Sequence, residues 1–188
     1  MSQSRGASSS ILILPAGPAD AEALARVHVK SWRETYRGLL PDAYLARMSE
    51  ADFTRRFRRA LTFPGPHEVT LAVMAREGLL GYAQGGPSRA GVEAEAEIAT
   101  LYVLRQAQGL GAGRRLLIAT ARALAAQGAR SLAIAVLRDN IPARGFYEHL
   151  GGCADAARPQ RGPGGVHHEV TYRWADIQDL LSPHAGSG

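Results

Sequence analysis

Hydrophobic positions divide the chain into short extended segments and longer helical ones. The apolar run at 11–14 predicts a first strand. Three helices are expected next, at 18–36, 41–48 and 49–61. Proline suits the first turn of the first two helices, and a Ser-x-x-Asp pattern resembles a capping box at the start of the third. The chain therefore begins with one strand and a block of helices.

Extended and helical patterns alternate in the middle of the chain. Apolar segments at 68–76 and 79–85 flank a Glu-Gly turn and predict a β-hairpin. A strand at 95–104 then leads through glycines into a helix at 111–127. The apolar strand at 131–137 leads into a second helix, which ends at Gly151-Gly152. This region therefore predicts two successive β-to-helix units.

The C-terminal segments complete the predicted order of elements. Residues 153–157 and 166–174 predict two strands on either side of a loop at 158–165, and a short helix is expected from Asp176. The resulting order is β-ααα-βββ-α-β-α-ββ. It predicts an α+β fold with a mixed, mostly antiparallel central sheet flanked by helices, and it argues against a purely alternating parallel fold.

Length and composition add a domain plan and a compartment. The 188 residues suit one domain, which we expect over 11–175, with a disordered tail over 1–10 and a tail containing the short helix over 176–188. No apolar run reaches about 18 residues, so we expect no membrane span. Cys153 is the only cysteine, which excludes an internal disulfide and favours the cytoplasm.

The charge balance is basic, with a net charge of +5 that comes almost entirely from arginine. A basic surface suits nucleic acid or an anionic cofactor equally well. The arginines form no long run along the sequence, so we do not expect nucleic acid as a partner. A large anionic cofactor and a solvated arginine face are the two explanations of the basic charge that stay open.

The glycine-rich turn indicates which anion could bind. Gln108–Gly113 has the pattern Q-x-x-G-x-G between a strand and a helix, where free N–H groups and the helix dipole favour a diphosphate. A P-loop needs lysine after its last glycine, but Arg114 follows Gly113. A dinucleotide fingerprint needs different spacing at the first strand of the fold. The remaining interpretation is the pyrophosphate of coenzyme A.

Two motifs in this order resemble the GCN5-related N-acetyltransferase (GNAT) family. Gln108–Gly113, preceded by the strand Leu101–Arg105, is similar to the family's acetyl-CoA pyrophosphate motif. Asn140–Gly152 is similar to a later motif, although Gly152 stands where the family usually has phenylalanine. Trp32–Pro41 resembles one bacterial branch. The resemblance extends over about residues 11–175.

The resemblance implies acetyl-CoA as a cosubstrate. In the family, the strand before the glycine turn parts from its neighbour, and the pantetheine arm enters the opening. One backbone N–H there polarises the thioester carbonyl. Asn140 either bonds the cofactor or caps its helix. The implied cofactor-binding residues are Leu101, Tyr102, Val103, Gln108, Gly109, Leu110, Gly111, Ala112, Gly113, Arg114, Asn140, Ala143, Phe146 and Tyr147.

The resemblance also implies two catalytic residues. Tyr147 would protonate the departing thiolate, whose thiol has a pKa of about 8.5; alternatively, it is a buried aromatic with a satisfied hydroxyl. Glu97 would take the proton of the acceptor amine, directly or through water. Glu95 is the alternative on the same strand face, and either carboxylate could instead be a solvated charge at a strand end.

The acceptor and the metal content are less well specified. Trp32, Tyr36 and Tyr82 are candidates to line an acceptor pocket, or are core aromatics. Adjacent strand residues point to opposite faces, so His167 and His168 are not expected to share a metal, and we predict none.

The sequence therefore predicts an N-acetyltransferase that moves an acetyl group from acetyl-CoA to a primary amine by direct attack. The acceptor is a small molecule or a peptide, and the family's habits suggest a homodimer. The alternative is the same fold binding acyl-CoA without turnover, as a sensor or interaction module.

Overall fold

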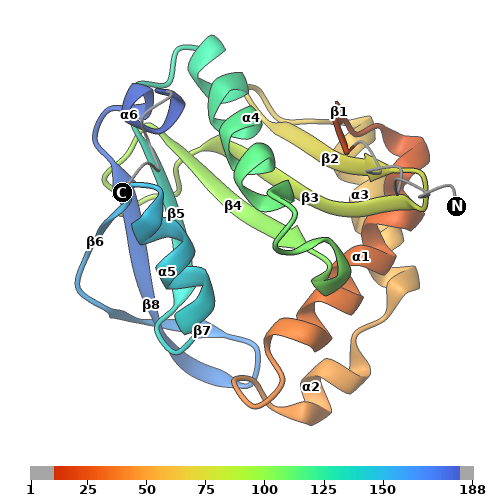
Figure 1. Cartoon of the computed structure of the whole chain (residues 1–188). Helices are drawn as coiled ribbons and strands as arrows, with labels where there is room; N and C mark the ends of the chain where they lie inside the picture. Colours follow the sequence, from red (N-terminus) through yellow and green to blue (C-terminus); the bar gives the residue numbers. More distant parts are fainter. Residues whose placement is uncertain (1–10, 183–188) are drawn as a thin grey trace, which may run out of the picture.

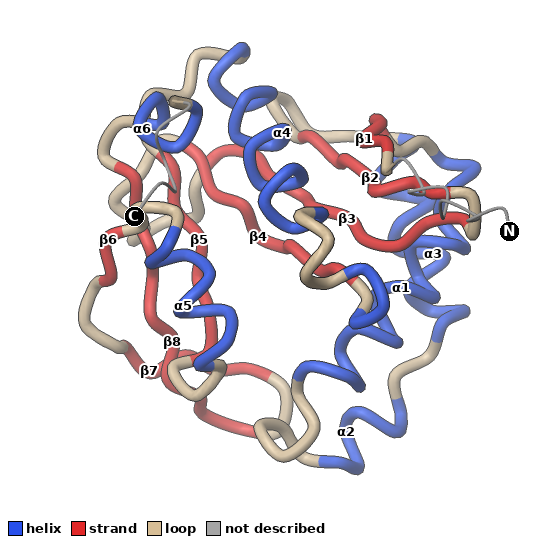
Figure 2. The backbone as a smooth tube through the Cα atoms, viewed as in Figure 1, coloured by secondary structure: helices blue, strands red, loops and turns tan. Residues whose placement is uncertain are grey.

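The computed structural model describes residues 11–182 and contains one eight-stranded sheet with helices on both faces (Figures 1 and 2). The strand order is β1-β2-β3-β4-β5-β8-β6, and β7 also pairs with β8. Only β4 and β5 are parallel neighbours, which confirms the predicted mixed, mostly antiparallel sheet. The strands are β1 (Leu12–Pro15), β2 (Val69–Ala75), β3 (Gly78–Pro87), β4 (Ala96–Val103), β5 (Leu132–Leu137), β6 (Cys153–Ala154), β7 (Arg158–Gly162) and β8 (Gly165–Trp174).

The helices form two layers around this sheet. Helices α1 and α3 pack against each other, and α1 contacts β3 and β4, whereas α4 contacts β2, β3 and β4 from the opposite face (Figure 1). Most of the buried apolar side chains lie between the sheet and the helices packed on it. A helix packed on a sheet in this way has one apolar stripe, which faces the sheet. The helices are α1 (Ala21–Thr35), α2 (Asp42–Arg47), α3 (Glu50–Thr62), α4 (Ala112–Ala126), α5 (Ile141–His149) and α6 (Ile177–Leu181), with short 3₁₀ turns at Pro18–Asp20 and Arg105–Ala107.

The parallel pair β4–β5 is the feature that positions the site. These strands are in register only at Ala96↔Leu132 and Glu97↔Ala133. Beyond that point β4 continues along β3 as far as Val103, while β5 continues along β8 as far as Leu137. The two strands therefore diverge toward their C-terminal ends (Figure 1).

The prediction of a loop at 158–165 was wrong. Residues Arg158–Gly162 form β7, which pairs with β8 in an antiparallel hairpin. All five residues of β7 are exposed, so no apolar alternation marks the strand, and Pro159 suits the edge of a sheet. The strand predicted at 153–157 is shorter and includes only Cys153–Ala154. The predicted tail at 1–10 lies outside the described residues, as does the end of the predicted tail at 176–188, whose first part forms α6 at Ile177–Leu181.

Within residues 11–182, the helices are all too short or too polar to cross a bilayer. The same residues contain no group of three histidine, cysteine or acidic side chains that could hold a metal ion.

Candidate active site

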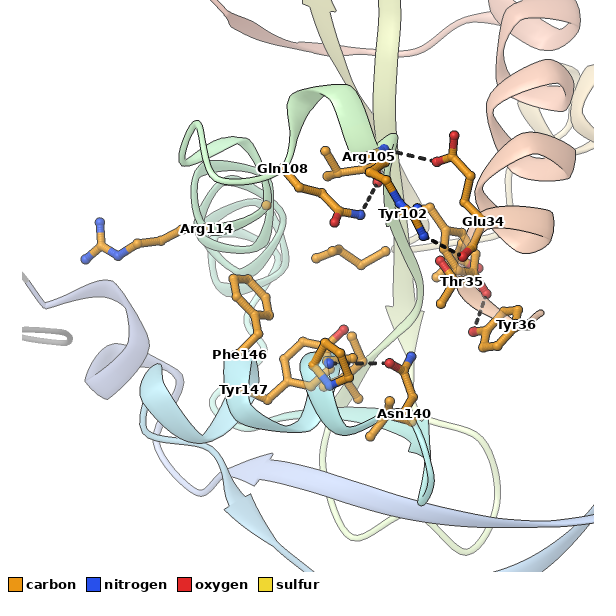
Figure 3. A pocket seen from close by; sticks show the side chains of 18 of the residues that line it. Glu34, Thr35, Tyr36, Tyr102, Arg105, Gln108, Arg114, Asn140, Phe146 and Tyr147 are labelled. Atoms are coloured by element: carbon orange, nitrogen blue, oxygen red, sulfur yellow. Dashed lines mark hydrogen bonds between the residues drawn. The ribbon is translucent and has the colours of Figure 1, made fainter. Parts of the chain in front are cut away.

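A cavity of about 550 Å³ opens between the diverging strands, the start of α4, helix α5 and the end of α1 (Figure 3). The elements that surround this cavity are far apart in the sequence. Its walls are formed by Glu34, Thr35, Tyr36, Ala99, Thr100, Leu101, Tyr102, Val103, Arg105, Gln108, Gly109, Gly111, Gly113, Arg114, Ile134, Ala135, Val136, Asn140, Pro142, Ala143, Phe146 and Tyr147.

The glycine turn forms one end of this cavity. Gly111 is the residue before α4 and has φ +75°, in the left-handed region that glycine adopts without strain. The first N–H groups of α4 lack partners inside the helix, so this end of the cavity is suited to an anion. Gln108 donates from Nε2 to the Val103 carbonyl at 2.9 Å, which ties the turn to the end of β4.

Most of the predicted cofactor-binding residues lie on the cavity wall. Leu101, Tyr102 and Val103 contribute from β4, opposite Ile134–Val136 of β5. Two predicted residues of the turn do not line the cavity, because the Leu110 side chain is exposed and the Ala112 side chain is buried in the main apolar core. Their contribution to a ligand would be limited to the backbone.

Helix α5 forms the opposite wall. Asn140 stands before its first turn, and its side-chain oxygen accepts a hydrogen bond from the Ala143 N–H at 3.4 Å, so Asn140 caps the helix. Phe146 approaches Gly113, where an added Cβ would lie 3.5 Å from the ring. The helices α4 and α5 therefore meet at the cavity with no side chain between Gly113 and Phe146.

Tyr147 combines burial with access to the cavity. Its ring packs near Phe146, Tyr172 and Trp174, and only 5% of the residue is exposed. Burial raises the pKa of Tyr147 well above its usual value, and the nearby Tyr36 adds to the rise. The phenol is therefore protonated at neutral pH, and the same shift makes it a weaker acid.

The three aromatics predicted for the acceptor have different positions. Tyr36 lines the cavity, and its hydroxyl lies 3.0 Å from that of Tyr102 (Figure 3). Trp32 lies behind it, with its ring 4.9 Å from that of Tyr36. Tyr82 is fully buried and shares a 2.5 Å hydrogen bond with His28, so it belongs to the core and not to the cavity wall.

The two predicted bases lie away from the cavity. Glu97 is the last residue of β4 that pairs with β5. It is buried and forms a 2.7 Å ion pair with Arg89. Glu95 forms a 2.8 Å ion pair with Arg130. Neither residue lines the cavity.

Glu34 is the carboxylate on the cavity wall, and sequence reasoning missed it. Its Oε2 accepts a hydrogen bond from the Arg105 N–H at 3.0 Å, and the Arg105 side chain bonds the Glu34 carbonyl. This contact joins the end of α1 to the end of β4. The two residues are 71 positions apart and belong to no motif, so no sequence pattern indicated it.

Comparison with known proteins gives the family. Residues 29–152 match the model of the acetyltransferase (GNAT) family. The uncharacterized N-acetyltransferase YuaI of Bacillus subtilis is 32% identical over 130 residues, which cover 69% of this chain and 72% of that protein. The chain therefore belongs to the acetyltransferase (GNAT) family.

Solved structures show the same fold. The PaiA N-acetyltransferase from Thermoplasma acidophilum, in complex with coenzyme A, has a TM-score of 0.64 at 19% identity, covering 88% of this chain and 99% of that one. YncA from Salmonella typhimurium, with its cofactor acetyl-CoA, has a TM-score of 0.66 at 20% identity, covering 96% and 99%. At these identities the comparison concerns the fold alone.

Proposed function

We propose that this protein transfers the acetyl group of acetyl-CoA to a primary amine by direct attack. The observation that carries the proposal is the opening between β4 and β5, which ends at a glycine turn on one side and at Tyr147 on the other. Family membership supports acetyl transfer, and two proteins of the same fold have been solved with coenzyme A or acetyl-CoA.

The residues present fit coenzyme A. The pyrophosphate would bind the N–H groups of Gly109–Gly113 at the start of α4, where the left-handed Gly111 keeps side chains away from the backbone. The pantetheine arm would extend along β4 beside Leu101, Tyr102 and Val103, whose edge is unpaired with β5. One backbone N–H of this edge would stabilise the developing charge on the thioester oxygen.

The proposed reaction forms one bond and breaks one. The amine nitrogen attacks the thioester carbon, a C–N bond forms, and the C–S bond breaks. Tyr147 gives its phenolic proton to the departing thiolate as the sulfur charge develops, and a proton taken up through water restores the neutral phenol. The proton of the amine leaves through water.

The alternative is a module of the same fold that binds acyl-CoA without turnover. The converging phenols of Tyr36, Tyr102 and Tyr147 favour the enzyme, since a simple binding site has no need of a protonated donor beside the cavity. The proposal also includes one domain over 11–175 and a reducing, cytoplasmic setting, which is consistent with the free, exposed Cys153.

A panel of amines incubated with the protein and acetyl-CoA tests the proposal. We expect release of free thiol in step with an N-acetylated product of mass 42 Da above the amine, a gain set by replacing one hydrogen with an acetyl group. Binding of coenzyme A together with thiol release no faster than in a protein-free control, across primary amines of every charge class, would support the binding module instead.

A further inference from the structure

Glu169 of β8 lies on the same sheet face as part of the cavity wall. Leu137 and Glu169 are register partners in the antiparallel β5–β8 pair, so their side chains share one face. Ala135, two positions before Leu137 on β5, lines the cavity. This face therefore continues from the cavity along the sheet to Glu169.

Aromatic residues cover this part of the face. A small apolar cluster is formed by α1, α2 and the residues between and beside them. Leu137 packs against this cluster, and so do Trp32, Tyr36 and Tyr44. Tyr36 also lines the cavity. The Trp32 indole N–H is buried and has no hydrogen-bond partner among the described residues. Glu169 thus adjoins an aromatic wall that connects it with the cavity.

The β7–β8 hairpin closes the outer side of this region. An added Cβ at Gly164, in the turn of the hairpin, would collide with the ring of Pro41, the residue before α2. The turn is therefore in direct contact with the connection between α1 and α2, and Figure 1 shows the hairpin reaching that connection.

The Glu169 carboxylate forms no ion pair in the part of the chain that the structure describes, although an arginine lies opposite it on β7. It is half-buried. Its cross-strand neighbour on β7 is Arg158, which is exposed and forms no ion pair with it. Its charge does reach the cavity wall: burial raises the pKa of Tyr36, and Glu169 adds to the rise. A half-buried carboxylate of this kind is suited to a cation supplied by a ligand.

We propose that Glu169 binds a second positive charge on the acceptor, so that the preferred acceptor is an amine with two cationic groups. This inference rests on the proposed function. Glu169 is not among the residues that line the cavity, so it would act away from the reacting nitrogen and determine specificity. The rings of Tyr36 and Trp32 would face the cationic ligand along its length, an arrangement that favours positive charge.

A pair of linear amines tests this assignment. Pentane-1,5-diamine and pentylamine have the same carbon chain and differ in the second ammonium group. Initial rates of thiol release are measured for the wild type, for Glu169→Gln, and for Glu22→Gln as a control on an exposed carboxylate of α1. We expect Glu169→Gln to raise the KM for the diamine by about 10- to 100-fold, the effect of losing a hydrogen bond between charged groups. The KM for pentylamine and for acetyl-CoA should stay within about twofold.

Equal KM ratios for the two amines in wild type and Glu169→Gln would overturn the assignment. Calorimetric titration of the diamine, with coenzyme A present, separates this outcome from failure of the proposed function. If the wild type releases no thiol, the proposed function fails. In that case, diamine binding that weakens in Glu169→Gln but not in Glu22→Gln still supports the cation site, and absence of binding to the wild type overturns it.

Discussion

At the scale of single residues, His28 is the buried group most sensitive to pH. It shares a hydrogen bond with Tyr82, and its Nε2 has no partner among the described residues. Burial lowers the pKa of His28 to about 4, and Arg56 contributes to the shift. The folded state therefore binds this proton less readily than the unfolded state, whose histidine titrates near 6.5.

We predict that stability falls between pH 6.5 and pH 4 because of His28. A lowered pKa in the folded state means that His28 does not oppose folding above pH 6.5 and that the penalty grows as pH falls toward about 4. The free energy of unfolding should be about 2–3 kcal/mol lower at pH 4.5 than at pH 7. Urea titrations at both pH values measure it.

Two variants isolate the contribution of His28. His28→Gln cannot be protonated and should lose most of the pH dependence, whereas the same change at the exposed His149 should preserve it. A pH dependence that survives in His28→Gln at full size would show that other groups cause it.

Glu97 provides a second prediction at this scale. Its ion pair with Arg89 and its position outside the cavity indicate a structural role, so Glu97→Gln should change kcat by less than about threefold, well below the effect of removing a catalytic base. The pH–rate profile should keep its shape. A loss of about 10²–10⁴ in kcat with an altered profile would restore Glu97 as the base.

At the scale of elements, the glycine turn was readable from the sequence because its glycines are required by the backbone. Gly111 has positive φ at the start of α4, and the motif that contains it has a fixed spacing. The divergence of β4 from β5 was implied only by the resemblance, because both segments look like ordinary apolar strands. Strand β7 could not be predicted, since none of its side chains is buried.

We predict opposite effects for two alanine substitutions in the turn. Gly111→Ala forces a left-handed conformation on alanine and should destabilise the protein by about 1–2 kcal/mol. Gly113→Ala places a methyl group in ordinary contact with Phe146 inside α4 and should be neutral or stabilising by up to about 1 kcal/mol. Urea unfolding measures both. A Gly113→Ala variant as unstable as Gly111→Ala would contradict the geometry of this turn.

The tip of the β7–β8 hairpin gives a second prediction for an element. Gly164→Ala should push the hairpin away from Pro41 and reduce kcat/KM for the amine by about tenfold or more, with little change for acetyl-CoA. Gly165→Ala is the matched control, because Gly165 also has positive φ but an added Cβ there touches nothing. Equal effects of both variants on the amine would mean that the contact with Pro41 has no role in acceptor binding.

At the scale of the whole molecule, the site depends on contacts between distant parts of the chain. The motifs containing Gly111 and Tyr147 could be found from the sequence through its resemblance to the family, and both line one cavity. Glu34 accepts a hydrogen bond from Arg105, which is 71 positions away in the sequence. Glu169 lies beside Leu137 only because β8 pairs with β5. Such residues carry no local signal, because strand register and hairpin position are set by the complete fold.

The most direct test of the central claim is Tyr147→Phe, with kcat and the Kd of coenzyme A measured on the same preparation. The substitution keeps the ring that packs against Tyr172 and Trp174 and removes only the hydroxyl. We predict that kcat falls by about 10²–10⁴ while the Kd of coenzyme A changes by less than about threefold, because the phenol donates a proton to the leaving thiolate and does not hold the cofactor. An unchanged kcat would contradict this account of the site.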